Sequence, residues 1–363
     1  MYLLFSFTIG GTERLIVDIC NEMVKRDNQV YLYIVNDLYD KKLLESLSPE
    51  VVIICKNRTI GSKKKILELF EISAFCKKNK IDIVHCNSFD VPELLLLTKL
   101  FQRRIKILYT IHGLEQFENI NKLRIIYRNI ICDSIIAISK SVKNDIVKAG
   151  IIESKISVIY NAIDTSKFKM NNKKKNLGRE IVIGNVARID CEKKGQDILL
   201  NAINELKDYY DVDCIFAGGA DEKHLEEYTN LKKKAENIIC DSNTRIEFIG
   251  NIDNVSEFLD NIDIFVLPSR SEGFGISLIE AMKMRVPCIA SDLSGPKEII
   301  GDNERGTLFQ TNNEHDLANK IRMVIENYGY YLAKAYEAEK YVEKNFDIKE
   351  MVNKLQKLYI EKS

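Results

Sequence analysis

The feature that most constrains the fold of this chain is a regular alternation of short apolar runs with segments of helical periodicity. In the first half, apolar runs typical of buried strands occupy Tyr2–Phe7, Val30–Val35, Val51–Ile54, Ile83–Cys86, Ile107–Ile111, Ser134–Ala137 and Ile156–Ile159. Helical patterns separate them, for example at Glu13–Lys25, Lys64–Lys78 and Ser141–Ala149. This alternation predicts an α/β architecture with mostly parallel sheets.

A second series of the same kind begins after a lysine- and asparagine-rich stretch, Met170–Asn176, which has no periodicity and is interpreted as a linker. Its expected strands are Ile181–Asn185, Cys214–Ala217, Ile246–Ile249, Ile264–Leu267 and Cys288–Ala290, with helices near Gln196–Leu206 and Ser256–Leu259. From His315 onward the pattern is helical. Because 363 residues exceed the size at which one core usually stops growing, we expect two doubly wound domains, 1–170 and 171–325, followed by helices over 326–363. If the domains face each other, ligands would bind in the cleft between them.

The composition of the chain indicates the cellular compartment and the kind of partner to expect. The nine cysteines are odd in number, scattered and without a C-x-x-C pair, which favours reduced thiols in the cytosol over disulfides or zinc. No apolar run reaches bilayer-spanning length, so we expect a soluble or peripheral protein. Residues 1–170 carry 26 Lys/Arg and 19 Asp/Glu, a net charge of +7, and the remainder carries −7. The basic half suits an anionic partner such as a membrane surface, although a chance partition of surface charge would give the same numbers.

Two carboxylates flank a Gly-Phe-Gly turn in the run from Pro268 to Met282. The preceding apolar run, Ile262–Leu267, predicts a strand, and a helix is expected from about Ile276. The glycines Gly273 and Gly275 let backbone amides approach a ligand, and a helix start favours phosphate or polyhydroxylated groups. Glu272 and Glu280 could then reach different parts of one elongated ligand. The alternative is an ordinary strand–helix unit with solvated glutamates.

Two basic residues follow the first strand of the second half. Arg188 and Lys194 could clamp a diphosphate at the carboxyl edge of the sheet, the arginine as a bidentate fork and the lysine as a point charge. They would neutralise charge on a departing nucleotide without a metal. A solvated basic loop is the alternative, and Lys193 competes with Lys194 for the phosphate.

Other candidates are a Gly-Gly turn and one histidine. Gly10 and Gly11 follow the first strand and could present free amides, but they do not form G-x-G-x-x-G and could be a plain turn. His112 ends a strand at a ligand-facing edge, where a structural role is the alternative. His224 and His315 lie in polar surroundings and are expected on the surface.

Several classes of site are not indicated. The chain has no H-E-x-x-H, G-x-S-x-G or P-loop motif and no Cys/His cluster, so no metal is expected. The basic clusters lack interleaved aromatics, which argues against nucleic-acid binding. The segment Lys122–Arg128 mixes cations with large apolar residues, as an interfacial helix does, and a buried helix with a basic solvated face fits equally well.

Taken together, these residues resemble the retaining glycosyltransferases of family 4, which have the GT-B fold. The resemblance covers nearly the whole chain, and its motifs occur in the family's order: Gly10–Arg14, Thr110–Gly113, Cys132–Val142, Val158–Asp164, Ala187-Arg188 with Lys194-Gly195, Glu272–Glu280 and Ser294–Glu298.

The resemblance implies a role for each candidate. Arg188 and Lys194 would hold the donor diphosphate, Glu280 the ribose, and Glu272 the hydroxyls of the transferred sugar. His112 would lie beside that sugar near the reacting carbon. The donor site would also include the first glycines and the amides of the turn, namely Gly10, Gly11, Gly273, Phe274, Gly275 and Ile276. The helices over 326–363 would pack back toward the N-terminal domain.

The resulting hypothesis is a metal-independent retaining hexosyltransferase with no cofactor besides its nucleotide-sugar co-substrate, for which a UDP-linked donor is favoured over a GDP-linked one. Its acceptor would be a glycan or a polyprenyl-linked glycan in bacterial surface polysaccharide synthesis. The setting would be cytoplasmic, with peripheral contact to anionic membrane at the inner face of the cell membrane. Two rivals are a GT-B nucleotide-sugar epimerase and a non-catalytic partner subunit of a transferase.

Overall fold

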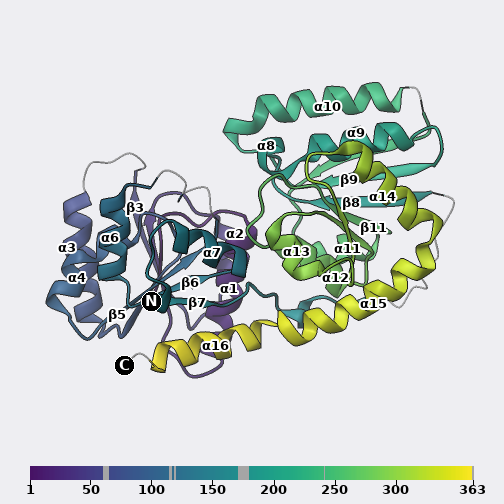
Figure 1. The fold of residues 1–363 in the computed structure, drawn as a ribbon. Coiled ribbons are helices and arrows are strands. Elements are labelled where there is room, and N and C mark those ends of the chain that lie inside the picture. Colours follow the sequence, from purple (N-terminus) through teal and green to yellow (C-terminus); the bar gives the residue numbers. More distant parts are fainter. Residues whose placement is uncertain (60–64, 114–116, 118–119, 171–179, 241, 362–363) are drawn as a thin grey trace. The chain divides into compact units, whose positions relative to one another are not determined.

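The computed structural model describes the chain except residues 60–64, 114–116, 118–119, 171–179, 241 and 362–363. The chain divides into two compact units, here called unit 1 (Met1–Ala162 with Ile348–Ser363) and unit 2 (Ile163–Asp347). Each unit is built on one parallel sheet with helices around it (Figure 1), so the predicted α/β class is confirmed. The predicted linker lies outside the described residues apart from Met170.

Unit 1 contains a seven-stranded sheet in the order β3-β2-β1-β4-β5-β6-β7. Its strands are β1 (Tyr2–Leu4), β2 (Tyr31–Asn36), β3 (Val52–Arg58), β4 (Ile83–Cys86), β5 (Lys106–Ile111), β6 (Ser134–Ala137) and β7 (Ile156–Val158). Its helices are α1 (Gly11–Val24), α2 (Lys41–Glu45), α3 (Lys65–Lys78), η1 (Pro92–Leu95), α4 (Leu96–Phe101), α6 (Lys122–Ile131), α7 (Lys140–Lys148), η2 (Glu153–Lys155) and α16 (Ile348–Glu361).

Unit 2 contains a six-stranded sheet in the order β10-β9-β8-β11-β12-β13. Its strands are β8 (Ile181–Val186), β9 (Val212–Ala217), β10 (Arg245–Gly250), β11 (Ile264–Leu267), β12 (Cys288–Ser291) and β13 (Thr307–Phe309). Its helices are η3 (Thr165–Lys167), α8 (Cys191–Lys194), α9 (Gln196–Leu206), η4 (Glu222–His224), α10 (Leu225–Ile239), α11 (Val255–Asp260), α12 (Ile276–Lys283), α13 (Ser294–Ile300), α14 (Glu314–Glu326) and α15 (Tyr328–Asn345).

The last helix of the chain belongs to unit 1. Arg26 of α1 donates from Nη1 to Asn353 Oδ1 at 2.6 Å and to Gln356 Oε1 at 2.9 Å, both on α16. In contrast, α15 packs against α12 and α14 against α9, all within unit 2. The units divide after Ala162, ahead of the boundary predicted after residue 170, and only α16 of the predicted C-terminal helices is part of unit 1.

Both sheets reverse their strand order at one point, between β1 and β4 in unit 1 and between β8 and β11 in unit 2. In doubly wound sheets ligands bind outside the carboxyl ends of the strands at this reversal. The loops that follow β1, β4 and β5 in unit 1, and β8, β11 and β12 in unit 2, are therefore the expected ligand edges. Among the helices that the structure describes, none combines the length and hydropathy needed to cross a bilayer.

Candidate active site

The loop after β8 carries both predicted cations of unit 2. It contains the short helix α8, whose first turn is capped by Asp190, a residue only 2% exposed that accepts from the backbone N–H of Lys193 at 3.1 Å. Lys194 is the last residue of α8, and Gly195 follows with a left-handed φ of 65°. The cap and the glycine together fix where Lys194 leaves the loop.

The loop after β11 is attached directly to the end of α8. The carbonyl of Lys193 accepts from the backbone N–H groups of Arg270 at 2.7 Å and Ser271 at 3.1 Å. A Cβ at Gly195 would collide with the carbonyl oxygen of Pro268, so the approach of the two loops requires glycine there.

This attachment brings two predicted site residues into contact. Lys194 Nζ lies 2.9 Å from Glu272 Oε2, and the two side chains are 27% and 15% exposed. Ser269 Oγ also donates to Glu272 Oε2, at 3.4 Å. The lysine therefore balances the charge of Glu272, and both retain an exposed edge on which a polar ligand could bind.

Arg188 lies on the same loop and is not bonded to this pair. Its side chain is 56% exposed, with Nη2 3.5 Å from Asp190 Oδ2 and Nη1 3.9 Å from Asp221 Oδ2. Its carbonyl accepts from Gln196 Nε2 at 2.9 Å, which holds the backbone. These ion pairs are longer than charge-assisted hydrogen bonds, so the exposed guanidinium can still donate to an anionic ligand.

The Gly-Phe-Gly turn leads into α12 as predicted from the sequence. Phe274 is buried and packs edge-to-face on Phe346, with ring centroids 5.3 Å apart. Gly275 has a left-handed φ of 111° and starts α12 at Ile276. Glu280 follows on the helix and is partly exposed. The buried phenylalanine anchors the turn, so the first amides of α12 stay beside Gly273 and Glu272.

A third loop, after β12, reaches the same turn. A Cβ on Gly295, the second residue of α13, would lie 2.8 Å from the carbonyl oxygens of Glu272 and Gly273 and from the carbonyl carbon of Gly273. The loops after β8, β11 and β12 thus converge around Glu272.

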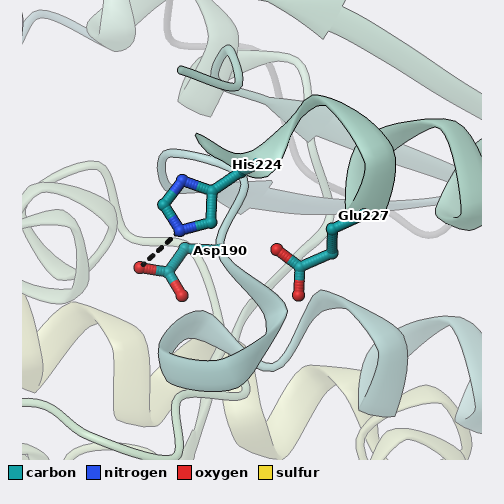
Figure 2. A group of neighbouring side chains, drawn as sticks. All are labelled: Asp190, His224 and Glu227. Atoms are coloured by element: carbon teal, nitrogen blue, oxygen red, sulfur yellow. Dashed lines mark ion pairs between the residues drawn. The ribbon is translucent and has the colours of Figure 1, made fainter. Parts of the chain in front are cut away.

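One group of side chains near Arg188 has ligand atoms close enough to hold a metal ion. Asp190, His224 and Glu227 offer ligand atoms within 4.8 Å of one another (Figure 2). His224 Nε2 lies 3.8 Å from Asp190 Oδ2 and its Nδ1 lies 2.5 Å from Asp221 Oδ1, while Glu227 Oε1 accepts from the N–H of Cys191 at 3.0 Å.

These contacts hold the β8 loop to η4 and α10. Asp190 also caps α8 and faces the Arg188 guanidinium, a cation that competes with any metal for the same carboxylate. The expectation of a metal-free site stays a prediction. The histidine was expected in a polar surface setting, whereas its ring is held between two aspartates.

In unit 1, His112 follows β5 and lines a cavity of about 240 Å³. The other lining residues come from the ends of α1, β4 and β5: Thr12, Glu13, Asn87, Ser88, Phe89, Tyr109, Thr110, Ile111 and Gly113. Burial lowers the pKa of His112 to about 4, so the ring is neutral near pH 7.

The neighbours of His112 define its tautomer. Asn87 Nδ2 donates to the carbonyl of His85 at 3.2 Å, which turns Asn87 Oδ1 toward His112 Nε2, 3.3 Å away. Because that oxygen can only accept, the proton of His112 is on Nε2. Nδ1 is then a buried lone pair that accepts no hydrogen bond from the described residues. It is suited to accept a hydrogen bond from a ligand hydroxyl.

His85 is a structural residue of the same unit. Its Nδ1 lies 2.7 Å from the hydroxyl of Tyr359 on α16, and its Nε2 lies 2.6 Å from Thr110 Oγ1. Burial lowers its pKa to about 3. It links α16 to β5, the strand that His112 follows.

The predicted glycines at the start of α1 have ordinary backbone geometry. Gly10 is the N-cap of α1 in an extended conformation, with a φ of −168°, and Gly11 is the first helical residue. A Cβ on Gly10 would meet only the flexible end of Glu13, so the backbone does not require glycine there. Gly10, Gly11 and His112 belong to unit 1, and the other predicted site residues belong to unit 2.

Comparison with known families decides the identity of the chain. The family model for glycosyl transferases group 1 matches residues 166–358, and that for glycosyltransferase family 4 matches residues 9–167. The chain belongs to glycosyltransferase family 4. The family predicted from the motifs is confirmed, and glycosyltransferase activity is the established activity of the family.

Relatives of this family 4 transferase include enzymes of surface-glycan synthesis. It is 31% identical over 258 residues to an uncharacterized glycosyltransferase of Methanocaldococcus jannaschii, a match that spans 68% of this chain and 66% of that protein. It is 29% identical over 290 residues to the O-antigen biosynthesis glycosyltransferase WclY of Escherichia coli, covering 73% and 76% of the two chains.

Solved structures agree with the GT-B fold. A glycosyltransferase from Rickettsia africae superposes with a TM-score of 0.85 at 24% identity, covering 99% of this chain and 98% of the other. HepE from Anabaena, solved in complex with UDP and glucose, has a TM-score of 0.84 at 20% identity, covering 98% of each. The predicted GT-B fold class is therefore confirmed for the family 4 transferase.

Some residues of the site were not predicted from the sequence. Asn87, which orients His112, and Asp190, which caps α8, carry no motif of their own. The one available signal is position, since each follows a strand that ends at the sheet reversal.

Proposed function

We propose that this family 4 transferase moves a sugar from a UDP-linked donor to a glycan or polyprenyl-linked glycan with retention of anomeric configuration and without a metal. The observation that carries the proposal is the Lys194–Glu272 contact at the start of α12. At the carboxyl edge of one sheet, it combines a cation that can bind phosphate, a carboxylate that can bind sugar hydroxyls and the backbone amides at the start of α12.

Each residue then has a role that follows from its chemistry. Arg188 and Lys194 bind the diphosphate and offset the charge that develops on the leaving nucleotide, the task of a metal in other transferases. Glu280 accepts hydrogen bonds from the ribose hydroxyls. Glu272 and the amides from Gly273 to Ile276 bind the hydroxyls of the sugar.

His112 contributes a hydrogen-bond acceptor rather than a charge. Its ring is neutral at pH 7, and its Nδ1 lone pair can accept from a sugar hydroxyl near the reacting carbon. In same-face transfer the acceptor hydroxyl attacks from the side that the nucleotide leaves, and the departing phosphate helps to remove its proton. The proposal therefore assigns no protein nucleophile.

The choice of donor and acceptor rests on relatives. HepE was solved with UDP and glucose, and separately with UDP-glucose. Named relatives serve O-antigen synthesis in Escherichia coli and capsular polysaccharide synthesis in Staphylococcus aureus. These relatives support a UDP-sugar donor and a surface-glycan acceptor at the cytoplasmic side of the membrane. The net positive charge of residues 1–170 is consistent with that location.

A thermal-shift comparison of UDP, GDP and their sugars tests the donor half. We expect UDP to raise the melting temperature of the wild type, with a smaller rise for Arg188→Ala and Lys194→Ala. Arg245→Ala is the matched control, because Arg245 is exposed on β10 and forms ion pairs at 3.6 Å with Glu180 and Asp213, remote from this loop. No shift with any nucleotide would support a non-catalytic subunit, and conversion of the donor without acceptor would support an epimerase.

A further inference from the structure

Exposed apolar side chains gather on three neighbouring helices of unit 1. In Figure 1, α3, α4 and α6 stand side by side; α3 packs against α4, and α6 packs against η1, which leads into α4. The side chains, each between 40% and 71% exposed, are Leu67, Phe70, Leu96, Leu100, Phe101, Leu123, Ile126 and Ile130. We call this set the α3–α4–α6 face.

On α6 these side chains form a stripe opposite the core. Leu123, Ile126 and Ile130 are three and four residues apart, which places them on one side of the helix. Ile125 and Ile131 are buried on the other side, so the helix is apolar on both. The sequence left open a buried helix with a basic solvated face, but Arg128 is fully buried, which excludes that reading for this arginine.

Topology puts the three stripes on the same side of the sheet. Helices α3, α4 and α6 connect β3 to β4, β4 to β5 and β5 to β6, and all three connections run in one direction across the strand order. Because such crossovers are right-handed, their helices cover the same face. The exposed side of each helix points away from the sheet, so the stripes form one outer surface.

The charges around this surface are mostly positive; the exposed acids beside it are Asp82, between α3 and β4, and Asp90, which pairs with Arg124. Lys77, Lys78, Arg103, Arg104 and Lys122 are exposed at or just beyond the ends of these helices, and none forms an ion pair with a described residue. The acids of the three helices are engaged, Glu68 by Arg58 at 2.9 Å and Glu71 by Lys56 at 2.6 Å. A second copy of the same face would bring cations against cations, whereas an anionic surface complements them.

We propose that the α3–α4–α6 face binds an anionic phospholipid bilayer, with its apolar side chains in the headgroup region and its cations on lipid phosphates. A face of this composition binds in the plane of the interface and does not span the membrane. The inference deepens the proposed function, because it gives the lipid-linked acceptor a docking surface, but it is tested by binding alone.

The test is co-flotation of the full chain with vesicles of phosphatidylglycerol and phosphatidylcholine, compared with phosphatidylcholine alone. We expect binding to the anionic vesicles that weakens with salt. The triple variant Leu123→Gln, Ile126→Gln, Ile130→Gln should lose at least tenfold in affinity. Arg103→Gln with Arg104→Gln should lose about 25-fold, on the basis of about fivefold per cation at a membrane surface.

The matched control places three glutamines on exposed apolar positions of unit 2, Leu225→Gln, Ile239→Gln and Ile249→Gln. It should bind vesicles as the wild type does. Each variant is also melted with UDP, since the donor residues lie in unit 2. A variant that loses flotation but keeps the UDP-induced rise in melting temperature supports lipid binding by the α3–α4–α6 face and leaves the donor site untested.

Three results would overturn the inference. Wild-type protein that floats with neither vesicle has no lipid-binding face. A triple variant that floats as well as the wild type places the binding elsewhere. Concentration-dependent dimers that the triple variant abolishes, in a protein that ignores vesicles, would make the face a contact between copies.

Discussion

Gly295→Ala is the substitution whose effect can be worked most directly from the geometry. The new Cβ would lie 2.8 Å from backbone atoms of Glu272 and Gly273, whereas ordinary van der Waals contact begins at 3.4 Å. The shortfall is 3.4 − 2.8 = 0.6 Å, and none of the opposing atoms is a flexible side-chain end. The turn that carries Glu272 must therefore move away from α13.

That movement reaches the proposed donor site. If Glu272 shifts by the full 0.6 Å away from Lys194, their 2.9 Å contact lengthens to 3.5 Å, beyond ordinary hydrogen-bonding distance. Overpacking of this kind costs about 1–3 kcal/mol of stability. Since a displacement of about 1 Å in a site can cost about 100-fold in rate, we expect roughly a tenfold loss in kcat/KM.

The assay is a urea midpoint by far-ultraviolet circular dichroism, because the chain has no tryptophan, together with donor turnover. Gly329→Ala in the first turn of α15 is the control: a Cβ there meets nothing within 4 Å, so the urea midpoint should stay at the wild-type value or rise slightly, with unchanged turnover. Wild-type midpoint and turnover in Gly295→Ala would refute the close approach of α13 to the turn.

Three further predictions concern the supports of the site. Burial lowers the pKa of His112 to about 4 and that of His85 to about 3, so unfolding takes up protons between these values and the unfolded pKa near 6.5. The urea midpoint should therefore fall as the pH drops from about 6.5 toward 4. A midpoint that does not change over this range would contradict the prediction. Asn87→Asp should raise the pKa of His112, because it places a carboxylate beside the ring. The midpoint of the imidazole ¹⁵N titration should then move to higher pH, with Asn87→Ala as the uncharged control. Glu339→Ala should cost less than the about 3–5 kcal/mol of a fully unpaired buried charge, because Lys283 of α12 loses its buried partner at 2.9 Å but keeps Glu343 at 2.8 Å; an unchanged urea midpoint would show that the Lys283–Glu339 pair adds nothing.

Much of the fold could be predicted because its information is local. Strand β11 is a run of four residues that are all buried, and such a run is visible in the sequence without any tertiary knowledge. Strand β13 lacks that signal, because it has only three residues and starts with threonine, so its structure depends on packing against its neighbour β12. Helix α10 was missed for another reason: its helix-forming lysines and glutamates leave only Leu231, Ala235 and Ile238 as a narrow buried stripe.

The site also has features that the sequence predicts and features that it does not. The Glu272 turn and the β8 cations follow their strands closely, so motif spacing was enough to group them. The tautomer of His112 could not be predicted, because it depends on Asn87 and on the carbonyl of His85, which are set by another strand. The apolar stripe on α6 was equally hidden, since periodicity does not say which of two apolar sides faces the core.

The most direct test of retaining transfer is the anomeric configuration of the first-formed product. With the UDP-sugar that gives the largest thermal shift and a glycan acceptor that it glycosylates, proton NMR of the new linkage reads the configuration from the anomeric coupling. We expect the wild type to form a product with the same configuration as the donor, and we expect Glu272→Ala to form no product. A product of inverted configuration would contradict retaining transfer.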